Sequence, residues 1–399
     1  MIKSGDSPIS MTQTSPEKLR THYQYFLPPE SDRILLTGHS HQAWPDVARD
    51  AVQLAFDDAA THVDDKWEAV FTQQNQVREV IATRCGGKAE EIALGQNTHE
   101  LFTRFLSALP LKERPKIVVS EGEFHSLYRQ LTALQGLNVE VIWIPVAPIQ
   151  TLSLRMADAL DERCATAICS TVLFQEGACV PELIALAERC NQLGVRLFLD
   201  AYHSFNITPF HIDELAPYPV YLSSGGYKYA QWGEGACWLR VPSEDHITPR
   251  FTGWFSDFEH LHEPRNPSVP LTYGSTPALR FAGSTFDPTS FYRAAAVARF
   301  FNEQGMTPQW LRERSLIQTQ RLIEGLDGYL TLRSPHDETQ RAGFVVFEHP
   351  DAYRIVHELR QQQILIDARG TAVRLGPAPY TLDDEIDRAI EALKVICTS

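Results

Sequence analysis

Lysine and basic charge are scarce in this chain. It has eight lysines in 399 residues, and Lys228 is the only one between Lys116 and Lys394. Lysine and arginine together number 36 against 50 aspartates and glutamates, so the formal net charge is −14. A chain this acidic repels phosphate backbones and anionic lipid surfaces, which argues against nucleic acid or a membrane as a partner.

Long apolar runs and a cysteine framework are missing as well. No stretch of about 18 apolar residues offers a membrane span. Residues 1–20 are polar and lack the apolar core of a signal peptide. The seven cysteines are an odd number and include no CxxC pair, which argues against a disulfide framework and favours reduced thiols. We therefore expect a soluble, cytoplasmic protein.

Apolar runs of strand length alternate with helical segments through much of the chain. The strand-like runs are residues 116–120, 139–146, 165–173, 195–199, 220–223 and 236–241. Helical patterns cover residues 46–84 and 181–193, and this alternation predicts an α/β fold with a mostly parallel sheet. A chain of 399 residues is too long for one ordinary core, so we expect two domains.

The last part of the chain has a different pattern. After residue 250 the sequence is irregular and rich in proline, and from about residue 288 helices dominate, with short strands at 343–347 and 373–375. This pattern predicts a smaller α+β domain. The expected units are an N-terminal arm with part of the small domain at 1–48, a large domain at 49–288 and a small C-terminal domain at 289–399.

The middle of the chain carries a strand that ends on a carboxylate and an isolated lysine. Residues 195–199 are nearly all apolar and lead into Asp200, and Lys228 follows 28 positions later between two tyrosines. Ligands of α/β sheets bind at the carboxyl ends of strands. Pyridoxal phosphate (PLP) requires a lysine for a Schiff base and an aspartate for its pyridinium nitrogen. Taken singly, such a lysine is also typical of the surface, and such an aspartate of a helix cap.

Two further positions have both a functional and a structural interpretation. Asn97, with Glu100 three residues later, indicates a helix start whose free amides could bind a phosphate or simply be capped. Phe124 follows a predicted strand and could stack on a pyridine ring or fill a core.

Four segments resemble kynureninases, within the wider class V aminotransferase and cysteine desulfurase group. They are residues 200–203 (Asp-Ala-Tyr-His), 227–229 (Tyr-Lys-Tyr), 253–255 (Gly-Trp-Phe) and 374–380 (Arg-Leu-Gly-Pro-Ala-Pro-Tyr), in the family's order. The similarity extends from Gly38 to the C-terminus. It implies the PLP-dependent fold type I, or aspartate aminotransferase superfold, with a mostly parallel seven-stranded sheet in the large domain and a smaller α+β C-terminal domain.

The resemblance also implies roles for individual side chains. Lys228 would form the Schiff base with PLP, Asp200 would pair with the ring nitrogen, and Tyr227 would act as an acid–base group and contact the phosphate. The other residues implied to bind the cofactor are Asn97, Thr98, Phe124, Thr171, His203, Trp254 and Ser284. Ser284 would come from the second subunit of a homodimer. Arg374 would grip the substrate α-carboxylate as a bidentate donor.

His39 and His41 lie where the chain departs from the family, in the turn at residues 38–45. Two histidines can begin a metal site, but no third ligand accompanies them. We therefore expect no metal, and a turn that closes over the substrate. The segment Gly283-Ser284-Thr285 is closer to the class V aminotransferase pattern.

The departures leave the reaction open. One possibility is a kynureninase-like hydrolysis of a Cβ–Cγ bond that releases alanine, and the other is a class V aminotransferase or other PLP-dependent lyase acting on a small amino acid. A cysteine desulfurase is disfavoured because residues 366–373 contain no cysteine. A non-enzymatic regulator is disfavoured because Lys228 and Asp200 are both present.

Overall fold

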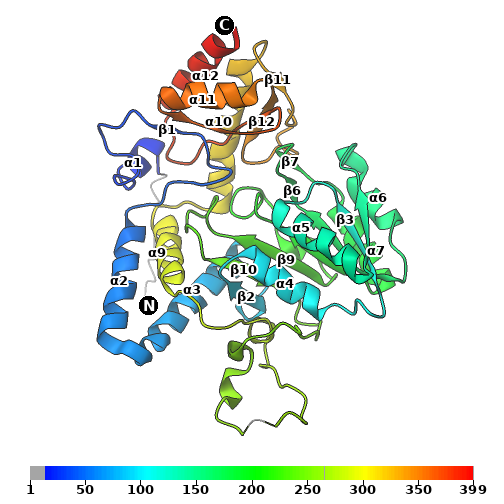
Figure 1. Ribbon diagram of the computed structural model, residues 1–399. Helices are drawn as coiled ribbons and strands as arrows, with labels where there is room; N and C mark the ends of the chain where they lie inside the picture. The colour runs from blue at the N-terminus through cyan, green and yellow to red at the C-terminus, as the bar shows by residue number, and fades with distance from the viewer. Residues whose placement is uncertain (1–13, 265, 399) are drawn as a thin grey trace, which may run out of the picture.

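The computed structural model describes residues 14–264 and 266–398, and it consists of a large α/β unit and a smaller α+β unit (Figure 1). The large unit contains a seven-stranded sheet in the order β2-β10-β9-β8-β5-β3-β4. In this order the strands span Ile92–Gly95, Cys237–Arg240, Val220–Gly225, Arg196–Asp200, Cys164–Ser170, Lys116–Ser120 and Glu140–Ile144. Within this sheet only β10 runs antiparallel to its neighbours. The predicted α/β fold with a mostly parallel sheet is confirmed.

Both faces of the sheet are buried, because successive side chains of a strand point to opposite faces. In β8, Leu197 and Leu199 belong to one hydrophobic core and Phe198 to another. Strands covered on both sides have little use for polar residues, which explains the continuous apolar runs in the sequence.

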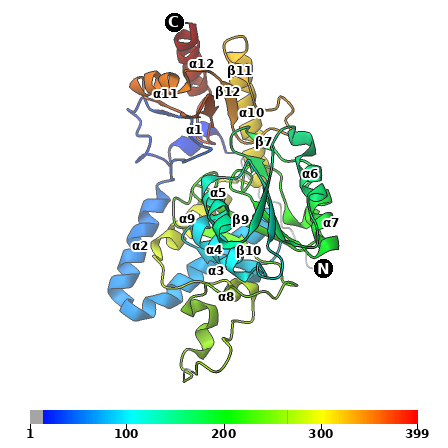
Figure 2. The ribbon, with the colours of Figure 1, turned by 45° about the vertical axis from the view of Figure 1, so that its right-hand side comes forward.

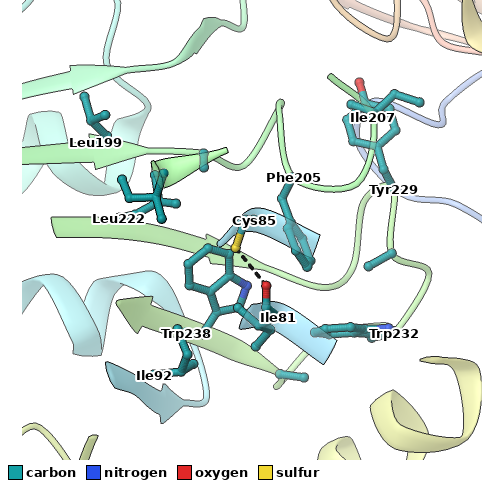
Figure 3. Close-up of a cluster of buried hydrophobic side chains, with 14 of the residues drawn as sticks. Ile81, Cys85, Ile92, Leu199, Phe205, Ile207, Leu222, Tyr229, Trp232 and Trp238 are labelled. Carbon is teal, nitrogen blue, oxygen red and sulfur yellow. Dashed lines mark hydrogen bonds between the residues drawn. The ribbon is translucent and has the colours of Figure 1, made fainter. Parts of the chain in front are cut away.

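Helices cover the two faces. α4 and α5 pack on the side of Phe198, in front of the sheet in Figure 2, and α3, α6 and α7 contribute to the opposite core. These helices span Trp67–Cys85 (α3), Thr98–Ala108 (α4), His125–Leu134 (α5), Leu152–Asp158 (α6) and Leu183–Leu193 (α7). In the opposite core the rings of Trp232 and Trp238 both contact Phe205 edge-on (Figure 3).

The long helix α9 (Thr289–Glu303) packs against two helices from the N-terminal part of the chain. It lies along α2 (Val47–His62) and α3, as Figure 1 shows, and its Phe291 belongs to the core of the large sheet. The helix predicted over 46–84 is interrupted at Val63, whose φ of 49° is incompatible with a continuous helix. A short 3₁₀ turn therefore separates α2 from α3.

The small unit has its own core and sheet. Its four antiparallel strands follow the order β11-β12-β15-β14 and span Thr331–Leu332, Val345–Glu348, Ala372–Leu375 and Asp367–Arg369. Its helices are α10 (Pro308–Leu326), α11 (Ala352–Gln361) and α12 (Asp383–Thr398). The N-terminal segment joins this unit, because β1 (Ile34–Leu35) pairs in parallel with β13 (Ile364–Leu365). The domain borders at 48 and 288 stay predictions.

The remaining elements are short. They are the helices α1 (Pro16–Arg20) and α8 (Pro277–Arg280) and the strands β6 (Val172–Leu173) and β7 (Ala178–Cys179), with the 3₁₀ helices Val63–Lys66, Ala89–Glu91, Gln135–Leu137, Ile149–Thr151, Ile212–Leu215 and Trp254–His260. Among the described residues, none of the helices combines the length and apolar character that crossing a membrane requires.

The strand predicted over 165–173 ends at Ser170. The next amide, of Thr171, donates to the backbone oxygen of Asp200 at 2.9 Å, and the chain then turns into the β6–β7 hairpin. This break brings Phe174 to the carboxyl end of the sheet, where it lines a cavity.

Candidate active site

A cavity of about 210 Å³ opens at the carboxyl ends of β8 and β9, next to the start of α4. It brings together seven of the residues predicted from the sequence: Asn97, Thr98, Phe124, Asp200, His203, Tyr227 and Lys228. Parallel strands end at the same edge of a sheet, which is why residues far apart in the chain meet here.

Lys228 is buried, so the interpretation as a surface lysine is wrong. Its side chain has 7% exposure, and Nζ lies 2.7 Å from His203 Nε2. The amine also lies 5.1–5.9 Å from the ring centres of Tyr202, Tyr227 and Phe124. Burial lowers the pKa of Lys228 well below its usual range, although the charge of Asp200 opposes that effect. A lysine held in this way supplies a neutral, nucleophilic amine.

Asp200 ends β8 and is also buried. Its carboxylate accepts the backbone N–H of Tyr202 at 2.9 Å. Burial raises the pKa of Asp200, while the Tyr202 hydrogen bond and the Lys228 charge oppose that increase. This local hydrogen bond holds a turn and fixes the carboxyl group at the cavity wall. In the described chain no helix begins directly after Asp200, so the helix-cap interpretation is wrong.

The start of α4 forms one side of the cavity. Asn97 caps the helix by accepting the Glu100 N–H at 2.9 Å, as the sequence predicted. Glu100 in turn accepts the N–H of Gln96 at 3.2 Å. The first turn of a helix presents free N–H groups and the positive end of the helix dipole, which favour an anion. Tyr202, whose hydroxyl lies 2.9 Å from Cys237 Sγ, lines the same cavity.

Several other predicted residues do not line this cavity. Thr171 lies behind the strand ends, with its hydroxyl 3.1 Å from the Asp200 backbone oxygen. His41 is exposed at the rim, where its ring stacks on Tyr227 at 5.3 Å and its Nε2 lies 3.5 Å from Glu234. Glu234 lines the cavity and was not singled out from the sequence.

Trp254 and Ser284 lie together elsewhere in the same chain. Trp254 Nε1 donates to Thr285 Oγ1 at 3.2 Å, and Ser284 borders a second cavity of about 290 Å³. The two segments touch closely, because a Cβ on Gly253 would lie 2.2 Å from the backbone oxygen of Gly283. Within one subunit, these residues therefore form a site separate from Lys228.

Arg374 and His39 form a buried network with Asp367. Arg374 Nε donates to Asp367 Oδ1 at 2.8 Å, Nη2 donates to Oδ2, and Nη1 donates to the Phe174 backbone oxygen at 3.1 Å. His39 Nε2 lies 2.8 Å from the same Oδ1. Burial lowers the pKa of His39 to about 4, so this ring is neutral at pH 7. Arg374 is thus buried behind Phe174 with an internal carboxylate as its partner.

Sequence reasoning did not identify Asp367. The pairing of two neighbouring strands could have indicated it, because Asp367 of β14 stands directly opposite Arg374 of β15 in the register of the antiparallel pair. Opposite charges at such cross-strand positions pair. Glu123, which is buried beside Ser170 near Asp200, was also passed over.

Solved structures of similar shape define the class of the protein. The chain superposes with a TM-score of 0.81 on a C-DES mutant with glycine covalently linked to its PLP cofactor, at 17% identity and with 93% of this chain and 98% of that chain covered. The apo cysteine desulfurase from Thermococcus onnurineus gives 0.79, at 17% identity and with 96% and 100% coverage. At this identity the likeness establishes the fold, which is that of the PLP-dependent fold type I enzymes.

Sequence relatives narrow this class. Residues 311–393 match the Kynureninase C-terminal domain. A kynureninase from Geobacillus thermodenitrificans is 24% identical over 353 residues, and one from Shouchella clausii is 26% identical over 353 residues, each with 82% of this chain and 78% of the relative covered. The chain is thus similar to kynureninases, within the wider class V aminotransferase group, and the resemblance predicted from the sequence is confirmed. Across residues 14–264 and 266–398, no cluster of three His, Cys, Asp or Glu side chains could hold a metal.

Proposed function

We propose that this protein is a PLP-dependent enzyme that hydrolyses the Cβ–Cγ bond of a kynurenine-like amino acid and releases alanine. The observation that supports it most is the placement of the buried Lys228 amine among aromatic rings in a cavity that Asp200 also lines. The similarity to kynureninases supports a kynurenine-like substrate. We also propose that the enzyme is a homodimer.

The residues of the cavity fit PLP. His203 Nδ1 is a buried polar atom without a hydrogen-bond partner among the described residues, and burial keeps His203 neutral by lowering its pKa. Phe124 is 39% exposed, which leaves part of its ring free for a flat ligand. The start of α4 supplies N–H groups for a phosphate. These groups fit PLP, which Lys228, Asp200, His203, Phe124 and the start of α4 would hold.

The chemistry divides between the cofactor and the chain. PLP, when bound, supplies the electron sink that makes the bonds around Cα and Cβ labile. Burial lowers the pKa of Lys228 to about 7, so neutral Nζ is available to take the proton from the substrate Cα. Burial raises the pKa of Tyr227, so its hydroxyl stays protonated near neutral pH and serves as the proton donor of the expected acid–base group. In the hydrolysis, water adds its hydroxyl to Cγ, the Cβ–Cγ bond breaks, the remaining proton of the water goes to Cβ, and Lys228 returns its proton to Cα, which yields alanine and an aryl acid.

The first alternative is a class V aminotransferase or another PLP-dependent lyase. The turn with His39 and His41 and the Gly283-Ser284-Thr285 segment differ from the kynureninase pattern and favour it. A cysteine desulfurase that carries sulfur on a protein thiolate is less favoured. Cys237 lines the cavity, but burial raises the pKa of its thiol to about 11, which keeps it protonated near neutral pH.

A homodimer would explain the placement of Trp254 and Ser284. Both residues lie away from Lys228 in their own subunit, so a role at the phosphate requires the cavity of a partner. Apolar side chains gather on the same part of the chain and are exposed in the single subunit: Phe251, Trp254, Phe258, Leu261, Val269 and Leu271. Exposed apolar surface of this kind marks a protein contact.

Incubation of the purified protein with substrates distinguishes the reactions. Kynurenine and 3-hydroxykynurenine should yield alanine and the aryl acid in equal amounts, and Lys228→Ala should yield neither. A panel of amino acid and keto acid pairs tests transamination in parallel. Formation of a new keto acid from an amino donor, without alanine and an aryl acid from kynurenine, would replace the hydrolase by the aminotransferase.

A further inference from the structure

Glu123 is a buried carboxyl group that the proposed chemistry does not use. It lies in the turn between β3 and α5 with 5% of its surface exposed. Its Oε1 accepts the backbone N–H of Ser170 at 2.7 Å, and its Oε2 lies 2.8 Å from Ser170 Oγ. Ser170 is the last residue of β5, stands opposite Asp200 in the register of the sheet, and lines the cavity. Glu123 thus ties two strand ends together at the cavity floor.

The turn that contains Glu123 is held at several points. Glu121 N donates to the Ile144 backbone oxygen at 2.9 Å, and Gly122 N donates to Ser120 Oγ at 2.9 Å. A Cβ on Gly122 would lie 2.5 Å from Leu173 Cδ2, so the turn is pressed against the β6 strand. The residue that follows Glu123 is Phe124, which begins α5.

Phe124 depends on this turn for its position. Its side chain is 39% exposed, so the surrounding core holds it only in part. It contacts Phe174 edge-on at 5.5 Å and has Lys228 Nζ 5.9 Å from its ring centre. A ring so placed and so lightly packed needs a fixed backbone if it is to stack reproducibly on a ligand bound at Lys228.

We propose that Glu123 is a positioning residue which, through its two contacts with Ser170, fixes the turn that carries Phe124 against the bound cofactor. This inference rests on the proposed function. Glu123 Oε1 accepts the Ser170 N–H and Oε2 accepts the Ser170 hydroxyl, so both carboxyl oxygens hold the same strand end. Burial, together with the charge of Asp200, raises the pKa of Glu123 to about 8.

Three variants test the inference by titration with PLP at pH 7. Glu123→Ala removes both contacts and should weaken PLP binding about tenfold or more and reduce the visible circular dichroism of the bound cofactor. Glu123→Gln keeps an acceptor for the Ser170 N–H and offers an amide donor to Ser170 Oγ, which can accept, so it should restore both values. Phe124→Leu should weaken binding as well. In the double variant Glu123→Ala/Phe124→Leu the two losses should not add, because they act through one ring.

Two outcomes of the PLP titrations would overturn the role of Glu123. One is Glu123→Ala with the PLP affinity and circular dichroism of the wild type, and the other is full additivity in the double variant. Loss of folding is checked by urea unfolding without cofactor. In that cofactor-free protein, amides 121–126 should exchange faster in Glu123→Ala than in Glu123→Gln, and equal rates would also refute the inference. A wild-type protein that does not bind PLP would instead refute the proposed function.

Discussion

Replacing Arg374 by alanine should lower both the stability of the protein and its recognition of substrate, and different assays measure the two losses. Arg374 is 3% exposed and donates two hydrogen bonds to Asp367 and one to Phe174. After Arg374→Ala, Asp367 keeps only the neutral His39 as a hydrogen-bond donor among these partners. Removal of one partner from a buried ion pair costs about 3–5 kcal/mol, mostly because the other charge stays buried. We expect a loss of this size in the free energy of unfolding.

Urea unfolding of the cofactor-free protein measures this loss, and a double variant gives the control. Arg374→Ala/Asp367→Ala removes both charges, so it should be more stable than Arg374→Ala alone. Burial would raise the pKa of Asp367, but the His39 hydrogen bond and Arg374 lower it below the usual value. Its stabilising contribution is therefore present at neutral pH and lost as the pH falls through the lowered pKa. Wild-type stability of Arg374→Ala would refute the argument.

Substrate recognition follows a different comparison between the same variants. If Arg374 binds the α-carboxylate, kcat/KM should fall about a hundredfold or more in both variants, which corresponds to roughly 2.7 kcal/mol or more at about 1.36 kcal/mol per factor of ten. Bound PLP should keep its absorbance in both, because Asp200, Lys228 and the start of α4 are unchanged. Activity that recovers in the double variant would show that Arg374 is structural, and Arg369, whose Nη2 is 3.9 Å from Asp367, would be the next candidate.

Three more predictions follow from the site. Borohydride reduction of the yellow holoenzyme should fix the cofactor on Lys228, and peptide mapping that finds the label on another lysine would contradict the assignment. Because the folded pKa of Glu123 is raised from 4.5 to about 8, wild type should lose stability relative to Glu123→Gln as pH rises between these values, and parallel stability profiles would disprove the shift. Sedimentation should show a homodimer. Ser284→Ala in one subunit should weaken PLP binding in the cavity of its partner and leave its own cavity unchanged. A monomer that binds PLP tightly would exclude a composite site.

Local patterns were sufficient for much of the fold. The apolar runs predicted six of the seven strands of the large sheet, all but β2, because a strand buried on both faces has no polar face to interrupt it. They missed the end of β5 at Ser170, since apolar residues resume at Val172 after Ser170 and Thr171, and only the pairing of β6 with β7 shows that the chain has left the large sheet. The break at Val63 was also missed, because a single residue with positive φ leaves no pattern in the helix.

The sequence by itself indicated the kind of chemistry that we propose, because an isolated lysine after a strand-end aspartate is readable from composition and spacing. Tertiary structure alone decided the surroundings that tune it: the 2.7 Å contact of Lys228 with His203, the buried pairing of Arg374 with Asp367, and the hold of Glu123 on Ser170. These partners are 25, 7 and 47 positions apart along the chain. Burial and partner distance set pKa values and orientation, and both arise only when separate strands meet at one edge of a sheet.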